Sequence, residues 1–260
     1  MTDRINRIGE ENVSNFSSKM IITRYKTNKD IDVYFSEYNW TAKNKQYNDF
    51  KNGKIKCPYE PRVYGHGYLG EGKYKMSENG KNTKCYEVWC KMLQRCYDEK
   101  LHEKYSTYTN CDVCKEWLCF QNFAEWYYKN YYEVGNEKMC LDKDILHKGN
   151  KIYSPENCIF VPEKINKLFP KRDNLRGKYP IGVCYNKQYG KFKAQCSVYD
   201  YEENKSKIKH LGYYETPQKA FEVYKEFKEQ NIKEVADYYK NQIPDKLYNA
   251  MYNYKVDIDD

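Results

Sequence analysis

The sequence has 260 residues, of which 45 are Lys or Arg and 37 are Asp or Glu, giving a formal net charge of +8. This length predicts one to three domains with a hydrophobic core, and the small basic excess permits a polyanionic partner without requiring one. No stretch approaches the roughly 18 to 20 apolar residues of a membrane span, and the first twenty residues lack the apolar core of a secretory signal. Eleven cysteines, an odd number, therefore indicate the core thiols of a reduced, cytoplasmic protein rather than a disulfide framework.

The first 75 residues are predicted to form a small β-module and a linker. Residues 20–25 and 30–35 are strand-like, and Asn28 and Gly53 belong to turn signals. Four glycines between Gly65 and Gly72 predict a linker or a loop that closes the module. Their spacing fits neither of the glycine-rich phosphate-binding patterns, so we expect no phosphate loop there.

Residues 76–170 are predicted to form a helical segment that leads into a hairpin. Apolar side chains recur every three or four residues over 84–97 and over 117–132, which is the spacing of helices with one buried face. Their large aromatic residues are expected in the core: Trp89, Trp117, Phe120, Phe123 and Trp126. Cys111 and Cys114 form half of a zinc-binding pattern with no second half at the usual spacing, so no zinc is expected.

Residues 139–169 carry the most specific pattern in the chain. Extended runs over 141–146 and 158–161, with 152–153 beginning the return, surround a turn at Gly149 and Asn150, and a short helix follows Pro162. This stretch resembles the HNH (His-Me finger) nucleases of the phage homing-endonuclease branch. Their pattern is an Asp/His pair on a hairpin, an Asn that closes its loop, and a second Asn or His on the next helix. Asn157 in PENC matches the middle Asn, and Asn166 in EKIN matches the last.

The resemblance implies a DNA endonuclease that uses a divalent metal ion, Mg²⁺ or Mn²⁺. Asp142, or Asp144 if the hairpin is shifted, would bind the ion together with Asn166, because hard cations take oxygen ligands. Asn157 would hold the loop through hydrogen bonds from its side chain.

Lys143 stands where these nucleases place the general-base His beside the first Asp. A protonated lysine cannot accept a proton, so the candidate substitute is His147, whose alternative interpretation is an exposed turn residue. Two functions therefore remain open. One is cleavage or nicking of DNA. The other is a catalytically inactive, nucleic-acid-binding regulator, or an inhibitor of a host complex that handles nucleic acid, with a host protein or nucleoprotein complex as the partner.

Residues 171–178 form a basic, turn-rich linker, after which the pattern changes. Three partly alternating runs and a helix that begins at Thr216-Pro217 cover residues 179–240, and residues 241–260 are expected to form a short helix and an acidic, frayed tail. The motifs Gly182-Val183, Gly190-Lys191-Phe192, Leu211-Gly212 and Thr216-Pro-Gln-Lys-Ala220 resemble the plant ethylene-response-factor (Apetala-two type) DNA-binding domain.

This second resemblance implies that a three-stranded antiparallel sheet enters the major groove of double-stranded DNA while the helix packs behind it. Period-two alternation predicts that Ala194, Cys196 and Val198 face the helix. The residues expected on the DNA-binding face are Tyr185, Lys187, Lys191, Lys193, Gln195 and His210. The predicted fold class is α+β, with an N-terminal β-module, a helical segment leading into a ββα core, and a C-terminal sheet on one helix.

Overall fold

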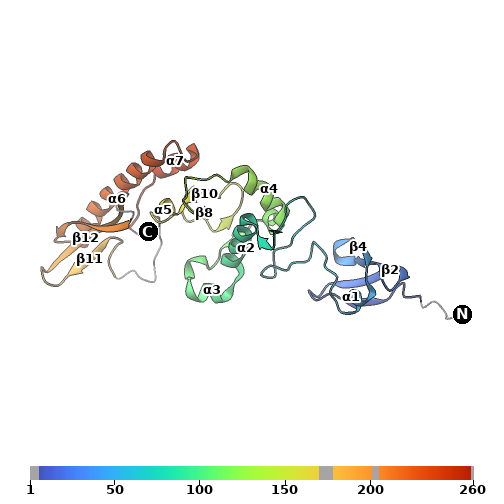
Figure 1. Cartoon of the computed structure of the whole chain (residues 1–260). Coiled ribbons are helices and arrows are strands. Elements are labelled where there is room, and N and C mark those ends of the chain that lie inside the picture. Colours follow the sequence, from blue (N-terminus) through green and yellow to red (C-terminus); the bar gives the residue numbers. More distant parts are fainter. Residues whose placement is uncertain (1–5, 170–177, 201–204, 259–260) are drawn as a thin grey trace. The chain divides into compact units, whose positions relative to one another are not determined.

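The computed structural model describes residues 6–169, 178–200 and 205–258 (Figure 1). Its fold is α+β, as predicted, with several small sheets and separate helices. The chain forms two compact units, residues 1–129 with 152–154 and residues 130–151 with 155–260. Apart from Lys178, the predicted linker at 171–178 lies outside the described residues.

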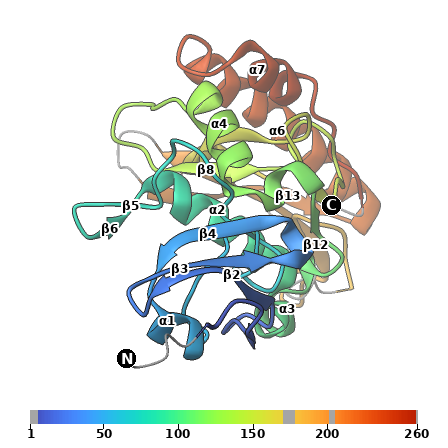
Figure 2. The same cartoon turned by 90° about the vertical axis from the view of Figure 1, so that its right-hand side faces the viewer.

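The first unit begins with a four-stranded antiparallel sheet in the order β1-β2-β3-β4, and Figure 2 shows β2, β3 and β4 side by side. Its strands are β1 (Glu11–Val13), β2 (Lys19–Thr27), β3 (Asp30–Phe35) and β4 (Trp40–Lys45), followed by α1 (Tyr47–Lys51). Apolar side chains at alternate positions of β2 and β3, including Met20, Ile22, Ile31, Val33 and Phe35, are buried together with Phe50 of α1. This is the predicted β-module.

The rest of the first unit is mainly helical. Its elements are β5 (Ser77–Glu78), β6 (Lys81–Asn82), α2 (Lys84–Tyr97), α3 (Glu99–Lys104), β7 (Asp112–Val113), α4 (Phe120–Asn130) and β9 (Ile152–Tyr153). Thr83 caps α2 because its hydroxyl accepts the backbone N–H of Tyr86. The indole N–H of Trp89 donates to the Trp117 carbonyl (2.7 Å), which satisfies a polar atom inside this core. Trp126 is half-buried, with its ring centroid 4.6 Å from that of Trp117.

The second unit contains the hairpin. Its strands β8 (Met139–Asp142) and β10 (Ile159–Pro162) pair antiparallel, and α5 (Glu163–Asn166) follows directly. The strand predicted over 141–146 therefore ends at Asp142. Residues 152–153 do not belong to the return strand, because β9 pairs in parallel with β7 of the first unit.

The C-terminal part of the second unit is a three-stranded antiparallel sheet, β11 (Val183–Asn186), β12 (Lys191–Asp200) and β13 (Lys205–Tyr214), with α6 (Pro217–Tyr239) packed along it (Figure 1). The Thr216 hydroxyl accepts the backbone N–H of Lys219 and caps α6. Gly182 has φ +76°, and a Cβ there would meet the Tyr224 ring at 2.1 Å, so only glycine permits this close approach of helix and sheet.

The long helix α6 contributes buried side chains to two apolar clusters of the second unit. Its N-terminal half packs behind the three-stranded sheet through Phe221 and Tyr224. Its C-terminal half and α7 (Asp245–Tyr252) share one apolar cluster with β10 and α5, in which Ile165, Ile232 and Leu247 are fully buried. After α7 the chain still packs, because Val256 is buried. Among the described residues, none of the helices is both long and apolar enough to cross a bilayer.

Candidate metal-binding hairpin and nucleic-acid interface

Asp142 is the last residue of β8, and its carboxylate is held by the chain that follows. Its Oδ1 accepts the backbone N–H groups of Asp144 (2.8 Å) and Ile145 (2.7 Å). Burial raises the pKa of the Asp142 carboxyl above its usual range, while these two hydrogen bonds act in the opposite direction. Among the described residues Oδ2 receives no hydrogen bond, so this atom is the part of Asp142 that remains available to a ligand.

Lys143 is buried with 5% of its surface exposed, and its amino group has two close partners. Nζ lies 2.6 Å from Asp144 Oδ1 and 2.8 Å from the backbone oxygen of Asn150. The side chain of Lys143 therefore crosses the loop after β8 and fastens one side of it to the other. An ammonium donates to these acceptors and has no lone pair with which to accept a proton, so it cannot serve as a general base.

Asn157 takes part in the same network. Its Nδ2 donates to Asn150 Oδ1 (3.2 Å), and Asn150 Nδ2 in turn donates to the backbone oxygen of Lys143 (2.9 Å). Asn157 and Asn150 thus connect the two ends of the loop between β8 and β10.

His147 is exposed, and its backbone carbonyl accepts the N–H of Asn150 in a tight turn, with Gly149 at φ +79°. Asn166 is the last residue of α5 and is half-buried. The part of the chain that the structure describes contains no side-chain hydrogen bond of His147 or of Asn166, and none that joins Asp142 to Asn166.

The donor atoms of Asp142 and Asn166 suit a hard divalent cation, because both are oxygens. The second carboxylate, Asp144, is exposed and forms the ion pair with Lys143. Within residues 6–169, 178–200 and 205–258, no group of three His, Cys, Asp or Glu side chains is arranged to hold a metal ion. One carboxylate and one amide fit the donor type of Mg²⁺, which commonly retains several waters and also binds substrate phosphate.

The register of the C-terminal sheet sorts the predicted DNA-binding residues by face. Ala194 and Cys196 are buried against α6, as predicted for the inner face of β12. Lys193 pairs across the strands with Tyr213 and Gln195 with His210, and these residues belong to the opposite, outer face. Irregular register after Ala194 inserts Leu211 between the paired residues Gly212 and His210. As a result the His210 and Tyr213 rings lie 4.7 Å apart.

Tyr185 is a correction to the predicted face. It is the cross-strand partner of Phe192, and their ring centroids are 5.2 Å apart. Val183, the partner of Ala194, alternates with Cys184, so Tyr185 belongs to the helix side of the sheet rather than beside Lys193. The prediction placed Tyr185 in the wrong register because the sequence does not fix how β11 and β12 are aligned.

The two remaining lysines of the predicted interface differ in their surroundings. Lys187 is exposed in the turn between β11 and β12, where Asn186 Oδ1 accepts the N–H of Gln188 (2.9 Å). Lys191 forms an exposed ion pair with Glu215 (2.7 Å). Lys187 is therefore in place to meet a polyanion, whereas Lys191 would have to exchange its partner first.

Exposed apolar and aromatic residues also lie near this face, and the sequence analysis missed them. Tyr189 is 56% exposed and its ring centroid is 4.8 Å from that of Tyr213. Ile208, the cross-strand partner of Ser197, is 69% exposed. The alternation of side chains over 205–214 could have indicated that Ile208 is exposed. The unpaired residue Leu211, however, shifts this alternation by one residue in the part of β13 that follows it.

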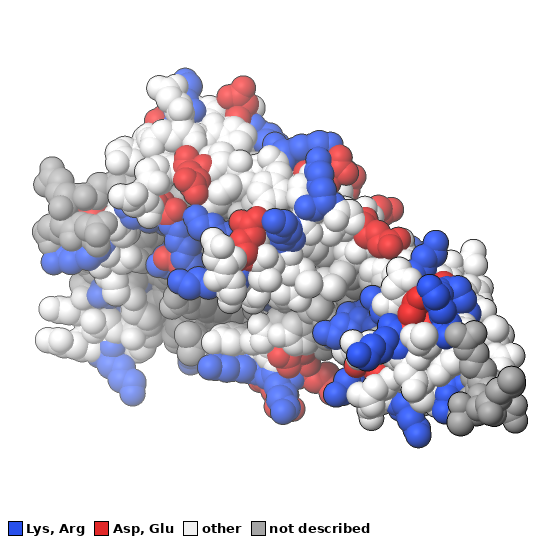
Figure 3. All heavy atoms as spheres, turned by 45° about the vertical axis from the view of Figure 1, so that its right-hand side comes forward, with Lys and Arg blue, Asp and Glu red and all other residues white. Residues whose placement is uncertain are grey.

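The net positive charge is not gathered on the face that Figure 3 shows, where Lys and Arg side chains are interspersed with Asp and Glu. Elsewhere among the described residues, basic side chains have acidic partners, as in the ion pairs of Lys138 with Glu163 (2.8 Å) and of Lys219 with Glu222 (2.8 Å). Charge alone thus identifies no interface there, and the argument rests on the sheet register.

Comparison with known proteins finds no matching family model and no match among curated proteins or solved structures.

Proposed function

We propose that this protein binds double-stranded DNA through the outer face of the sheet β11–β13. The observation that carries the proposal is the strand register, which places Lys193, Gln195 and His210 together on the face opposite α6. Lysines near that face would contact phosphates, and Gln195 could bond an adenine edge in the major groove. The resemblance to phage proteins adds the cytoplasm of a host cell as the proposed location.

The test is DNA affinity as a function of salt, measured by fluorescence anisotropy with a labelled duplex. Lys193→Ala combined with Gln195→Ala should weaken binding at least about tenfold and reduce the slope of log K against log salt by about one. The matched control is Lys209→Ala. Lys209 adjoins His210 in β13, but its amino group lies over the Phe227 ring of α6 (4.7 Å).

Affinity that is absent at low salt, or that falls equally in Lys209→Ala, would exclude the outer face as the DNA-binding surface. The alternative partner would then be a host protein or nucleoprotein complex, and the protein a regulator or inhibitor.

A second function, metal-dependent nicking of DNA, is favoured by the hairpin itself. The ββα element carries Asp142 with Oδ2 available and Asn166 on the following helix, and Asn157 belongs to the network that holds the loop. Mg²⁺ or Mn²⁺ held by Asp142 and Asn166 would neutralise charge on the scissile phosphate and activate water. Because Lys143 is bonded as an ammonium, His147 is the residue left to accept a proton.

Nicking is tested with supercoiled plasmid carrying cognate phage DNA, in Mg²⁺ and in Mn²⁺. Loss of a general base typically lowers the rate by about two to four orders of magnitude, so slow nicking is expected. Asp142→Ala with Asp144→Ala should abolish it, as should Asn166→Ala. His147→Ala separates the two roles of that residue, since only a general base would lower the rate.

Lys143→His should raise the rate if position 143 faces the scissile phosphate. No nicking in either metal, with Lys143→His equally inactive, would leave DNA binding as the function of this scaffold.

A further inference from the structure

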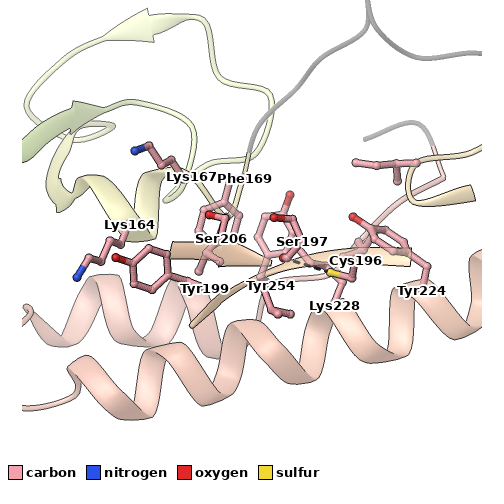
Figure 4. Close-up of a pocket in the computed structure, with 14 residues that line it drawn as sticks. Lys164, Lys167, Phe169, Cys196, Ser197, Tyr199, Ser206, Tyr224, Lys228 and Tyr254 are labelled. Carbon is pink, nitrogen blue, oxygen red and sulfur yellow. Dashed lines mark hydrogen bonds between the residues drawn. The ribbon is translucent and has the colours of Figure 1, made fainter. Parts of the chain in front are cut away.

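The second unit contains a cavity of about 150 Å³ at the side of β12 that β11 does not cover. β11 pairs with β12 only as far as Ala194, and the N–H of Gln195 still reaches the Gly182 carbonyl (2.9 Å). Beyond that point the cavity is bounded by β12, α5, α6 and the C-terminal segment (Figure 4). Among its lining residues are Lys228, Cys196, Ser197, Ser206, Tyr199 and Tyr254.

Lys228 is the residue that makes this cavity unusual. It lies in α6 with only 9% of its surface exposed, between the buried residues Tyr224 and Ile232. Among the described residues its amino group has no hydrogen bond and no ion pair. Burial lowers the pKa of Lys228, and the Cys196 thiol is the neighbouring group that acts in the opposite direction.

No carboxylate lines the cavity in the part of the chain that the structure describes. Lys164 and Lys167 of α5 also contribute to its wall, and Figure 4 shows their amino groups directed away from Cys196. Both have acidic partners elsewhere, Glu137 at 3.5 Å and Glu163 at 2.9 Å. The cavity therefore holds one cation, that of Lys228, which has no acidic partner among the described residues.

Burying an ammonium without a hydrogen-bond or charge partner costs free energy, and buried charges in proteins are therefore usually paired with an opposite charge or a ligand. An ammonium supplies three hydrogen-bond donors. In the described part of the chain the cavity has no carboxylate that would compete with an anionic ligand for them.

We propose that this cavity is a binding site for a phosphate group, with Lys228 as its counter-charge. The ligand class is a phosphomonoester, since charge-assisted bonds favour a doubly charged oxyanion. The largely apolar and aromatic remainder of the wall, with Tyr199 and Tyr254, suits the organic body of such a ligand. This site is separate from DNA binding by the outer face, which requires neither Lys228 nor the cavity.

A phosphomonoester could be a free nucleotide or the 5′-phosphate at a DNA end. Calorimetric titrations with sodium phosphate, thymidine 5′-monophosphate and thymidine test the free ligand at constant ionic strength. Duplexes with a 5′-phosphate or a 5′-hydroxyl test the DNA end. We expect saturable binding of the monophosphate and not of thymidine, and a difference between the duplexes only if DNA ends are the source.

Lys228→Met should weaken binding of the monophosphate at least about tenfold, because a bond to a charged group contributes about that factor. Lys228→Arg should retain part of the affinity. The control is Lys225→Met, three residues earlier in α6, whose amino group lies 3.8 Å from Glu229 and which does not line the cavity. It should bind as the unmodified chain does.

Without ligand, Lys228→Met should melt no lower than the unmodified protein, because an apolar side chain of similar length replaces an unpaired ammonium. Phosphate should raise the melting temperature of the unmodified protein and not of this variant. The proposal is overturned if no saturable binding occurs up to about 20 mM ligand, well above a Kd of 1 mM. It is equally overturned if Lys228→Met, or Lys228→Gln should the first variant not fold, binds like the unmodified chain.

Discussion

Lys143 and Lys228 are both buried in the second compact unit, with 5% and 9% of their surfaces exposed, but their surroundings differ. The amino group of Lys143 is bonded to Asp144 and to the Asn150 carbonyl. That of Lys228 has no bond of either kind among the described residues and lines a cavity. A buried ammonium that is already compensated holds a loop together, whereas one that is not compensated indicates a missing ligand.

The two lysines show that the place of a residue in a sequence pattern does not determine what its side chain does in the fold. Under the predicted resemblance to HNH nucleases, Lys143 would stand in the place of the general base, yet its bonds are those of a structural residue. Lys228 stands in no motif, yet among the described residues its buried side chain has an amino group without a hydrogen bond or an ion pair. Substituting Lys143 should therefore lower the stability of the fold, whereas substituting Lys228 should not, and measuring both variants tests the comparison directly.

The largest effect is expected for Lys143→Met. Loss of the ammonium leaves the Asn150 carbonyl without its donor, and an unsatisfied buried polar group costs about 1–3 kcal/mol. The exposed Asp144 is rehydrated and adds little. Urea unfolding at neutral pH should show a lower midpoint for Lys143→Met. The midpoint of the matched variant Lys228→Met should not be lower than that of the unmodified chain. Equal destabilisation of both variants would remove the distinction between the two lysines.

Local signals in the sequence predicted much of the fold but little of the pairing. The apolar spacing over 84–97 coincides with α2 (Lys84–Tyr97), and Thr216 caps α6 as predicted, because both depend on neighbouring residues. β9 pairs with β7, forty residues earlier in the chain, and no local pattern encodes that choice. The alignment of β11 with β12 is likewise not encoded by neighbouring residues, and Tyr185 was therefore assigned to the wrong face of the sheet.

The candidate site shows the same division. Asp142, Asn157 and Asn166 were predicted from the resemblance to the HNH nucleases. The burial of Lys143 and its bond to the Asn150 carbonyl arise from the path of the loop, which no local pattern encodes. Lys228 had a sequence signal that was not used. It stands four residues after Tyr224 and four before Ile232, in the middle of an apolar stripe of a helix.

A smaller effect is expected for Asn157→Ala. This change removes the bond from Nδ2 to Asn150 Oδ1, and a neutral hydrogen bond contributes about 1 kcal/mol. Asn150 also donates to the Lys143 carbonyl. The effects of Asn157→Ala and Lys143→Met on the free energy of unfolding should therefore not be additive. A double-mutant cycle of Lys143→Met and Asn157→Ala, measured by urea unfolding, gives their coupling. Strict additivity would show that Asn157 acts independently of the Lys143 network.

The smallest effect is expected where the charges are exposed, at Glu163 in the first turn of α5. Its carboxylate pairs with Lys138 (2.8 Å) and Lys167 (2.9 Å), and these bonds lower the pKa of Glu163 to about 2. A depressed carboxyl pKa stabilises the fold above the unfolded-state value of about 4.3, and that stabilisation is lost as the pH falls towards 2.

Both lysines are largely exposed, with side chains 73% and 67% accessible, so water and salt screen the pairs. Glu163→Gln should therefore lower the free energy of unfolding at pH 7 by at most about 0.5 kcal/mol. The difference between variant and unmodified chain should shrink as the pH is lowered from about 5 to about 2. Urea unfolding at several pH values, repeated at high salt, measures it. A loss at pH 7 as large as that of Lys143→Met would mean that exposed and buried pairs stabilise this unit alike, contrary to the distinction drawn between bonded and solvated charges.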